Sequence, residues 1–171
     1  MPFRTMCSLV FFLVLGASLF AIAQIPENFR LEALAGYWQG QGEVLLPNTS
    51  LTISIDGKAV FTYDSLTSRL RTQIDARKFI FSYADSGYLY HDTGTDSISW
   101  DTWNSSGKHV RYIGIIKNSV FTGADTRHGY LYRVKIDFIT ADSLDFTLTA
   151  TDHKGDSTTQ AAITLWRSKN E

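Results

Sequence analysis

The stretch from residue 130 to residue 151, YLYRVKIDFITADSLDFTLTAT, decides the fold class. Apolar residues occupy alternate positions on both sides of Ala141-Asp142, and polar or charged residues fill the positions between them. Alternation with a period of two is typical of a β-strand that has one buried face and one face in water. Two such strands joined by a short polar turn predict an antiparallel hairpin.

Similar strand patterns follow one another from Gly36 to Arg167, and no helical pattern separates them. Short connections between successive strands favour an antiparallel sheet. We therefore expect an all-β fold: a meander of about eight to ten strands that either closes into a single antiparallel β-barrel or splits into a sandwich, with the barrel as the prediction. Asp56-Gly57 predicts a type I′ hairpin turn, and Pro26–Ala35 predicts a short N-terminal helix that ends at Gly36 and plugs one end of the barrel. The expected strands are 37–46, 51–55, 58–64, 69–74, 78–83, 88–92, 97–104, 109–117, 119–123, 130–140, 143–151 and 157–167.

The first and last strands carry the prediction that the sheet closes. Trp38, Gly40 and Gly42 share one face of the first strand, and the two glycines leave room for a bend or for close packing. Arg167 shares the apolar face of the last strand. If the two strands pair, Arg167 comes over the indole of Trp38, in a cation–π contact worth about 0.5–2 kcal/mol. We expect these two residues to have a structural role in barrel closure.

The first residues have the pattern of a secretory signal peptide. Arg4 supplies a positive charge, residues 9–20 form an apolar run, and Ala21-Ile22-Ala23 has the form of a cleavage site. The run is shorter than the roughly 20 residues that a membrane-spanning helix needs. The sequence thus predicts a signal peptide at 1–23, a barrel domain at 24–171 with no transmembrane segment, and a periplasmic or extracellular protein.

Composition and motifs exclude several function classes. A formal net charge of −1 argues against a nucleic-acid-binding protein. The four histidines have no metal-ligand spacing and the only cysteine is Cys7, so no metal site is expected. The sequence holds neither a Gly-x-Ser-x-Gly motif nor a phosphate-binding loop. We predict no catalytic residue, and a non-catalytic role is favoured over an enzyme.

Aromatic residues at alternating strand positions give the one positive functional signal. They indicate either a barrel filled by side chains or a cavity lined by aromatic rings and hydroxyl groups. Tyrosines favour the cavity because a hydroxyl buried in a dry core needs a partner. The alternation of side chains between the two faces of each strand predicts that the pocket is lined by Tyr90, Trp100, Tyr112 and Tyr132. The expected partner is a small apolar or amphiphilic molecule.

Two family resemblances bear on this hypothesis. Gly36-x-Trp38 together with Arg167 resembles the lipocalin and calycin superfamily, in which a tryptophan of the first strand and an arginine of the last close the base of the barrel. Three stretches resemble a bacterial family of secreted, lipocalin-like proteins of unknown function, and this resemblance implies the fold. They are Leu31-x-x-Leu34-x-Gly36-x-Trp38, the segment from Tyr88-Leu89-Tyr90 to Trp103, and Phe138 to Arg167.

Gly36-Tyr37-Trp38-Gln39-Gly40-Gln41-Gly42 is similar to the start of nitrobindin-type haem barrels. Those proteins hold haem iron through a histidine early in the last strand. Residues 157–162 contain no histidine here, and His153 lies in the preceding turn. We therefore expect no cofactor. The alternatives to ligand binding are a haem-associated or acid–base barrel enzyme, and an interaction module of the cell envelope that holds no ligand.

Overall fold

The structure is a computed structural model that describes residues 30–46, 49–78, 81–92, 94–95 and 97–169. The predicted signal peptide at 1–23 lies outside the described residues. All regular elements but one are strands. The order of the elements is η1 (Leu31–Leu34), β1 (Gly36–Leu45), β2 (Thr52–Asp64), β3 (Arg69–Lys78), β4 (Phe81–Asp92), β5 (Ser97–Asn104), β6 (His109–Lys117), β7 (Val120–Arg127), β8 (Tyr130–Thr140), β9 (Ser143–Thr151) and β10 (Ser157–Arg167).

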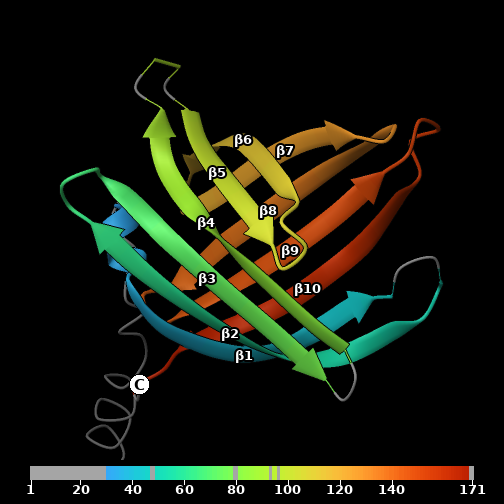
Figure 1. The fold of residues 1–171 in the computed structure, drawn as a ribbon, viewed down its shortest axis with the longest axis horizontal. Helices are drawn as coiled ribbons and strands as arrows, with labels where there is room; N and C mark the ends of the chain where they lie inside the picture. Colours follow the sequence, from blue (N-terminus) through green and yellow to red (C-terminus); the bar gives the residue numbers. More distant parts are fainter. Residues whose placement is uncertain (1–29, 47–48, 79–80, 93, 96, 170–171) are drawn as a thin grey trace, which may run out of the picture.

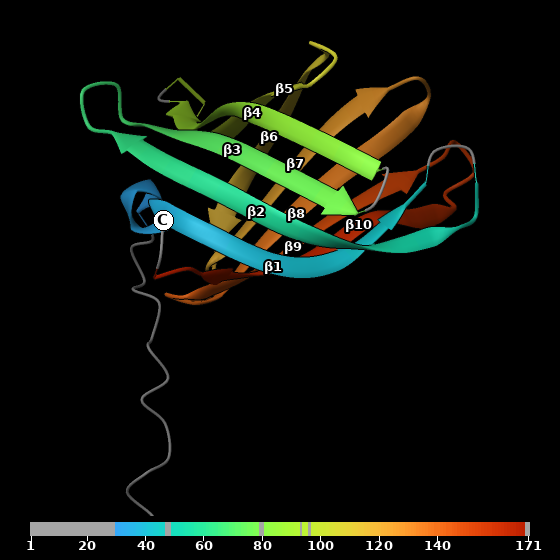
Figure 2. The same ribbon diagram turned by 60° about the horizontal axis from the view of Figure 1, so that its bottom comes forward.

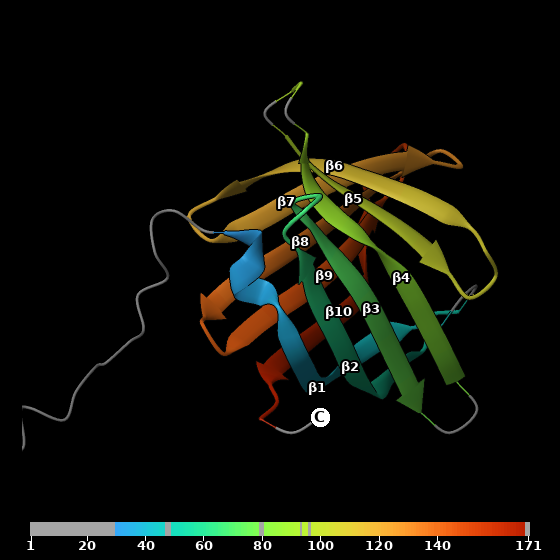
Figure 3. The same cartoon turned by 60° about the vertical axis from the view of Figure 1, so that its left-hand side comes forward.

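The strands form one closed antiparallel barrel (Figure 1). Each strand pairs with the next in the chain, and β1 pairs with β10 to complete the circle. The turned view in Figure 3 shows the sheet curving round from the first strands to the last. The prediction of a single lipocalin-like barrel is confirmed by this closed strand order. Pairing of the first strand with the last leaves the antiparallel meander without a free edge.

The predicted hairpin turn at Asp56-Gly57 is wrong. Strand β2 runs straight through this pair, which bonds to β1 on one side and to β3 on the other. A side chain at Gly57 would come within 3.4–3.5 Å of Ile163 and Leu165 on β10. These are ordinary van der Waals distances, and the pairing with both neighbouring strands overrides the tendency of Asp-Gly to form a turn.

The predicted strand 88–92 and residues 81–83 of the predicted strand 78–83 belong to the single strand β4, whereas Lys78 ends β3. The pairing with β3 and β5 continues through the residues between them. A Cβ atom at Gly87 would lie 1.9 Å from the carbonyl oxygen of Asp101. Gly87 thus marks a close approach of β5 to β4 rather than a break in the strand.

The predicted helix at Pro26–Ala35 is a single 3-10 turn within the described residues, which begin at Arg30. Figure 2 shows this turn against one end of the barrel. No side chain caps it, and so short an element persists only by docking on the sheet. Leu34 provides that docking, since it is only 4% exposed. No helix of the described residues is long and apolar enough to cross a membrane.

Candidate functional site

The end of the barrel next to η1 is closed by side chains. Trp38 is 3% exposed, and its indole Nε1 donates a hydrogen bond to the carbonyl of Leu34 at 3.0 Å. Arg167 is directly opposite Trp38 in the β1–β10 pair, with its guanidinium carbon 4.5 Å from the centre of the Trp38 ring. Its nitrogens donate to the carbonyls of Ala35 at 2.6 Å and of Ala33 at 2.8 Å. These bonds tie the last strand to the segment before the first.

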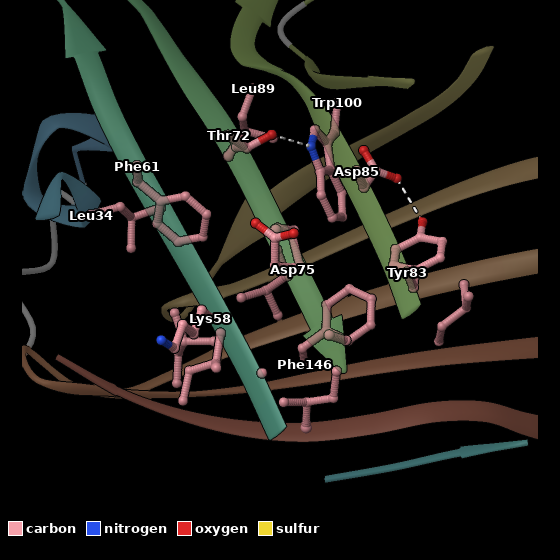
Figure 4. Close-up of a pocket in the computed structure, with 18 of the residues that line it drawn as sticks. Leu34, Lys58, Phe61, Thr72, Asp75, Tyr83, Asp85, Leu89, Trp100 and Phe146 are labelled. Carbon is pink, nitrogen blue, oxygen red and sulfur yellow. Dashed lines mark hydrogen bonds between the residues drawn. The ribbon is translucent and has the colours of Figure 1, made fainter. Parts of the chain in front are cut away.

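Above this closed end the interior holds an apolar cavity of about 180 Å³ (Figure 4). Its wall comes from almost every strand, because inward-facing residues alternate with outward-facing ones around the whole barrel. The apolar side chains that line it include Leu34, Val44, Ile55, Phe61, Leu70, Ile74, Leu89, Trp100, Ile136, Phe138, Leu144, Phe146, Leu148, Ile163 and Leu165. The barrel is hollow and not completely filled.

The opposite end carries a more polar depression of about 270 Å³, which we call the mouth. It is lined by Tyr83, Asp85, Trp100, Thr102, Asn104, Lys108, Val110, Tyr112, Arg127, Tyr132, Phe146 and Leu148. Five of these residues also line the apolar cavity: Tyr83, Asp85, Trp100, Phe146 and Leu148. The mouth and the cavity therefore adjoin, with a polar entrance and an apolar interior.

Tyr83 and Asp85 lie where the mouth meets the cavity. The Tyr83 hydroxyl donates a 2.7 Å hydrogen bond to Asp85 Oδ2. The other carboxyl oxygen, Oδ1, is buried and has no hydrogen-bond partner in the described part of the chain. Burial raises the pKa of Asp85, and the hydroxyls of Tyr83 and Thr102 offset part of that rise. Thr102 is thus near the carboxyl, but its hydroxyl does not complete a hydrogen bond to Oδ1.

Arg127 is the cation of the mouth, and its charge already has partners. Its guanidinium carbon lies 4.1 Å from the centre of the Tyr132 ring, and its Nη2 donates to the Tyr112 hydroxyl at 3.3 Å. Asp125 forms an ion pair with it at 3.7 Å. Burial raises the pKa of Tyr112, while the charge of Arg127 acts in the opposite direction. The arginine is held between the two tyrosine rings.

Three of the four residues predicted from strand parity line the site. Trp100 borders both the cavity and the mouth, and Tyr112 and Tyr132 border the mouth. The Trp100 indole donates a hydrogen bond of 3.3 Å to the Thr72 hydroxyl. Its ring lies 5.8 Å from that of Tyr112 and 6.2 Å from that of Phe146. The rings of Trp100, Tyr112 and Phe146 form one aromatic cluster beside the mouth.

The prediction for Tyr90 is wrong. Its neighbour Leu89 faces the cavity and is 2% exposed, so Tyr90 faces outward. The Tyr90 hydroxyl donates a 2.7 Å hydrogen bond to Asp101 on the outer surface. In the sequence Tyr-Leu-Tyr, an apolar side chain faces inward whether the leucine or the two tyrosines point into the barrel. Only burial in the folded barrel decides between these two orientations.

Asp101 on the outer face is a fully satisfied carboxylate. It accepts hydrogen bonds from Tyr90, from His109 at 2.8 Å and from Arg111 at 2.7 and 3.0 Å. Burial acts to raise its pKa, but the hydrogen bonds from Arg111, Tyr90 and His109 outweigh burial and lower the pKa to about 2. This group of four side chains holds β4, β5 and β6 together from outside.

Sequence reasoning missed the three charged residues that line the mouth, Asp85 and Arg127 on strands and Lys108 in a turn. A signal was present in each strand. Asp85 shares its parity with Tyr83 and Leu89, and Arg127 shares its parity with Phe121. A charged residue on the inward face of a strand costs free energy unless it has a partner or a function, so each of these positions was detectable once the inward face was known.

The residues present do not fit haem bound in the manner of the nitrobindin-type barrels. None of the four histidines, His91, His109, His128 and His153, lines the cavity or the mouth of the described barrel. His109 is on the outer face with Asp101, and His128 occupies the turn between β7 and β8. The described residues also contain no cluster of side chains suited to a metal ion. We derive no chemistry through either group.

Comparisons with known proteins support the fold alone. No family model matches the sequence, and no curated protein matches it. The structure is similar to that of Rv2717c from M. tuberculosis, with a TM-score of 0.59 and 16% identity over 81% of this chain and 95% of that one. It is also similar to an S-type phycobiliprotein lyase, CPES, from Guillardia theta, with a TM-score of 0.55 and 13% identity over 82% and 92% of the two chains.

A third similar structure is a protein of unknown function of the DUF3598 family from Nostoc punctiforme. The TM-score is 0.57 and the identity is 12%, over 82% of this chain but only 49% of that one. The chain therefore spans about half the length of the DUF3598 protein. Together with the ten-stranded closed sheet, these similarities show a lipocalin-like barrel fold.

Proposed function

We propose that the protein binds a small amphiphilic molecule, without chemically changing it, in the cavity of the barrel. The observation that supports this is the apolar cavity of about 180 Å³ that adjoins a mouth with aromatic and charged groups. Its volume is slightly larger than that of an apolar protein cavity of about 150 Å³ that admits benzene. The apolar part of the ligand occupies the cavity and its polar end lies in the mouth.

The proposed place of action is outside the cytoplasm. This rests on the signal-peptide pattern of residues 1–23. A carrier or sensor of an amphiphile in the periplasm or outside the cell suits a small barrel with an open end. The similarity to a phycobiliprotein lyase agrees with a barrel that holds a small molecule, although the identity of the ligand comes from the site and not from that protein.

The first test is native mass spectrometry with an absorbance spectrum, on protein exported with its own N-terminal segment. We expect the mass of a chain that begins at Gln24 and a reproducible extra mass that is lost on denaturation. Bare protein that also fails to bind an uncharged fluorescent naphthalene dye contradicts ligand binding and favours the interaction module. An absorption band near about 400 nm, in the range typical of haem proteins, supports the haem alternative instead.

A pair of alanine variants locates the bound molecule. Ala76 is buried and lines the cavity, whereas Ala84 on the next strand faces outward. Ala76→Phe fills the cavity and is expected to abolish binding of the naphthalene dye. Ala84→Phe adds the same side chain outside and should bind the dye as the unmodified protein does. Thermal unfolding checks that both variants fold, and equal dye binding by both would place the dye outside the barrel.

A further inference from the structure

The strongest unexplained feature of the interior is the carboxyl of Asp85. Its Oδ1 atom is buried without a hydrogen-bond partner, and this is the one such side-chain atom in the described part of the barrel. A buried polar atom without a partner lowers the stability of the folded state. Asp85 keeps this unpaired oxygen at a position that borders both the cavity and the mouth.

Several polar groups around Asp85 already have partners, and the Thr102 hydroxyl lies near the carboxyl and acts to lower its pKa. Arg127 forms its ion pair with Asp125, donates to Tyr112 and stacks on Tyr132. The Tyr83 hydroxyl donates to the second oxygen of Asp85 itself. Lys108 lies at the exposed rim, where water screens its charge. No basic side chain of the described residues forms an ion pair with Asp85.

The surroundings of Asp85 suit an organic cation. In Figure 4 the carboxyl lies between the Trp100 indole and the Tyr83 ring, above the Phe146 side chain. Faces of tryptophan and tyrosine rings attract an ammonium group, most strongly where water is excluded. A carboxylate that lacks a counter-charge attracts such a group as well, whereas an anionic head group would meet repulsion from the same carboxylate.

From this geometry we infer that the ligand is an amphiphilic amine, whose ammonium group pairs with Asp85 while its apolar tail lies in the cavity. The inference rests on the proposed function and specifies its ligand class. The ammonium donates a hydrogen bond to Oδ1 and supplies the missing positive charge. Burial raises the pKa of Asp85 in the empty barrel, and the bound cation acts to lower it again.

Three probes with the same tail test the inference: n-hexylamine, n-hexanol and n-hexanoate, titrated by NMR at neutral pH. The tail suits a cavity of about 180 Å³. We expect hexylamine to bind about ten to a hundred times more tightly than hexanol, the range of a charge-assisted hydrogen bond. Hexanoate should bind more weakly than hexanol, because its head group has the same charge as Asp85.

Two variants separate the role of Asp85 from a general effect of charge. Asp85→Asn should reduce the affinity for hexylamine to about that of the same variant for hexanol. Asp145, which accepts a hydrogen bond from Thr164 at 2.7 Å, provides the control, because Asp145→Asn should keep the preference for the amine. A ¹³C NMR titration of the Asp85 carboxyl should show its pKa falling when hexylamine is added.

The possible failures are distinguishable. If none of the three probes binds and the naphthalene dye does not bind either, the proposed function is wrong. If hexanol or hexanoate binds at least as tightly as hexylamine, or if Asp85→Asn keeps the amine preference, the barrel still binds amphiphiles but the inferred amine is wrong.

Discussion

The two ends of the barrel are built on opposite principles. At the end closed by η1, the polar groups have partners: the Trp38 indole bonds to Leu34, and Arg167 bonds to backbone carbonyls on both sides of it. At the open end, Asp85 remains with one buried oxygen unsatisfied. The closed end has the properties of a structural element and the open end those of a site, because unmet polar groups persist mainly where function maintains them.

The largest expected effect concerns the closed end. Trp38→Ala removes a fully buried side chain and should lower the free energy of unfolding by about 3–5 kcal/mol. Trp166, which is 50% exposed on the neighbouring strand, provides the control, and Trp166→Ala should cost less than about 1 kcal/mol. Chemical denaturation measures both. Equal losses would show that closure does not depend on the buried indole.

An intermediate effect concerns Asp101, the satisfied counterpart of Asp85. Its pKa is about 2 in the fold against 3.8 in a free side chain. Because the folded-state pKa is the lower one, the stabilisation is present above about pH 4 and is lost as pH falls from about 4 to about 2. Allowing for solvent around Arg111 and His109, the contribution is about 1–2 kcal/mol.

The measurement is the free energy of unfolding of Asp101→Asn and of the unmodified protein between pH 2 and pH 7. The deficit of the variant should be largest at neutral pH and should shrink toward pH 2. Asp75→Asn breaks only an exposed ion pair, with Arg77 at 3.6 Å, and should change little. A deficit that is constant with pH would indicate that the carboxyl of Asp101 does not act through its charge.

The smallest effect has the opposite sign and concerns the open end. Asp85→Asn removes a carboxylate that the fold disfavours, so it should raise the stability of the empty protein by roughly 1 kcal/mol at neutral pH. Because burial raises the pKa of Asp85, the gain should grow as pH rises from about 4 through that raised pKa. A loss of stability at neutral pH would mean that the empty barrel satisfies Oδ1 by itself.

Sequence periodicity sufficed for most strands and for closure. The predicted ranges 97–104, 109–117, 130–140, 143–151 and 157–167 coincide with β5, β6, β8, β9 and β10. In β6 and β8 burial alternates along the strand, so local pattern and burial agree, whereas β5 buries residues 98–102 on both faces. The pattern failed at Asp56-Gly57, where pairing with β1 and β3 keeps the strand continuous, and at Gly87, where the backbone of β5 comes too close for a side chain.

The site was predictable only in part. Trp100, Tyr112 and Tyr132 share their parity with buried neighbours, so alternation placed them inside. Tyr90 failed because the segment Tyr-Leu-Tyr permits either face. Asp85 and Arg127 were missed because a charged residue in a strand predicts an outward face by default.

The sequence by itself determined the all-β class and most strand positions, since these follow from alternation and from short connections, whereas the pairing of the first strand with the last was only a condition for closing the barrel. Only the tertiary structure decided that the barrel is hollow, which end is open and which carboxyl lacks a partner. Those properties depend on how side chains from distant strands pack in the interior of the barrel. The spacing of residues along the chain does not specify that packing.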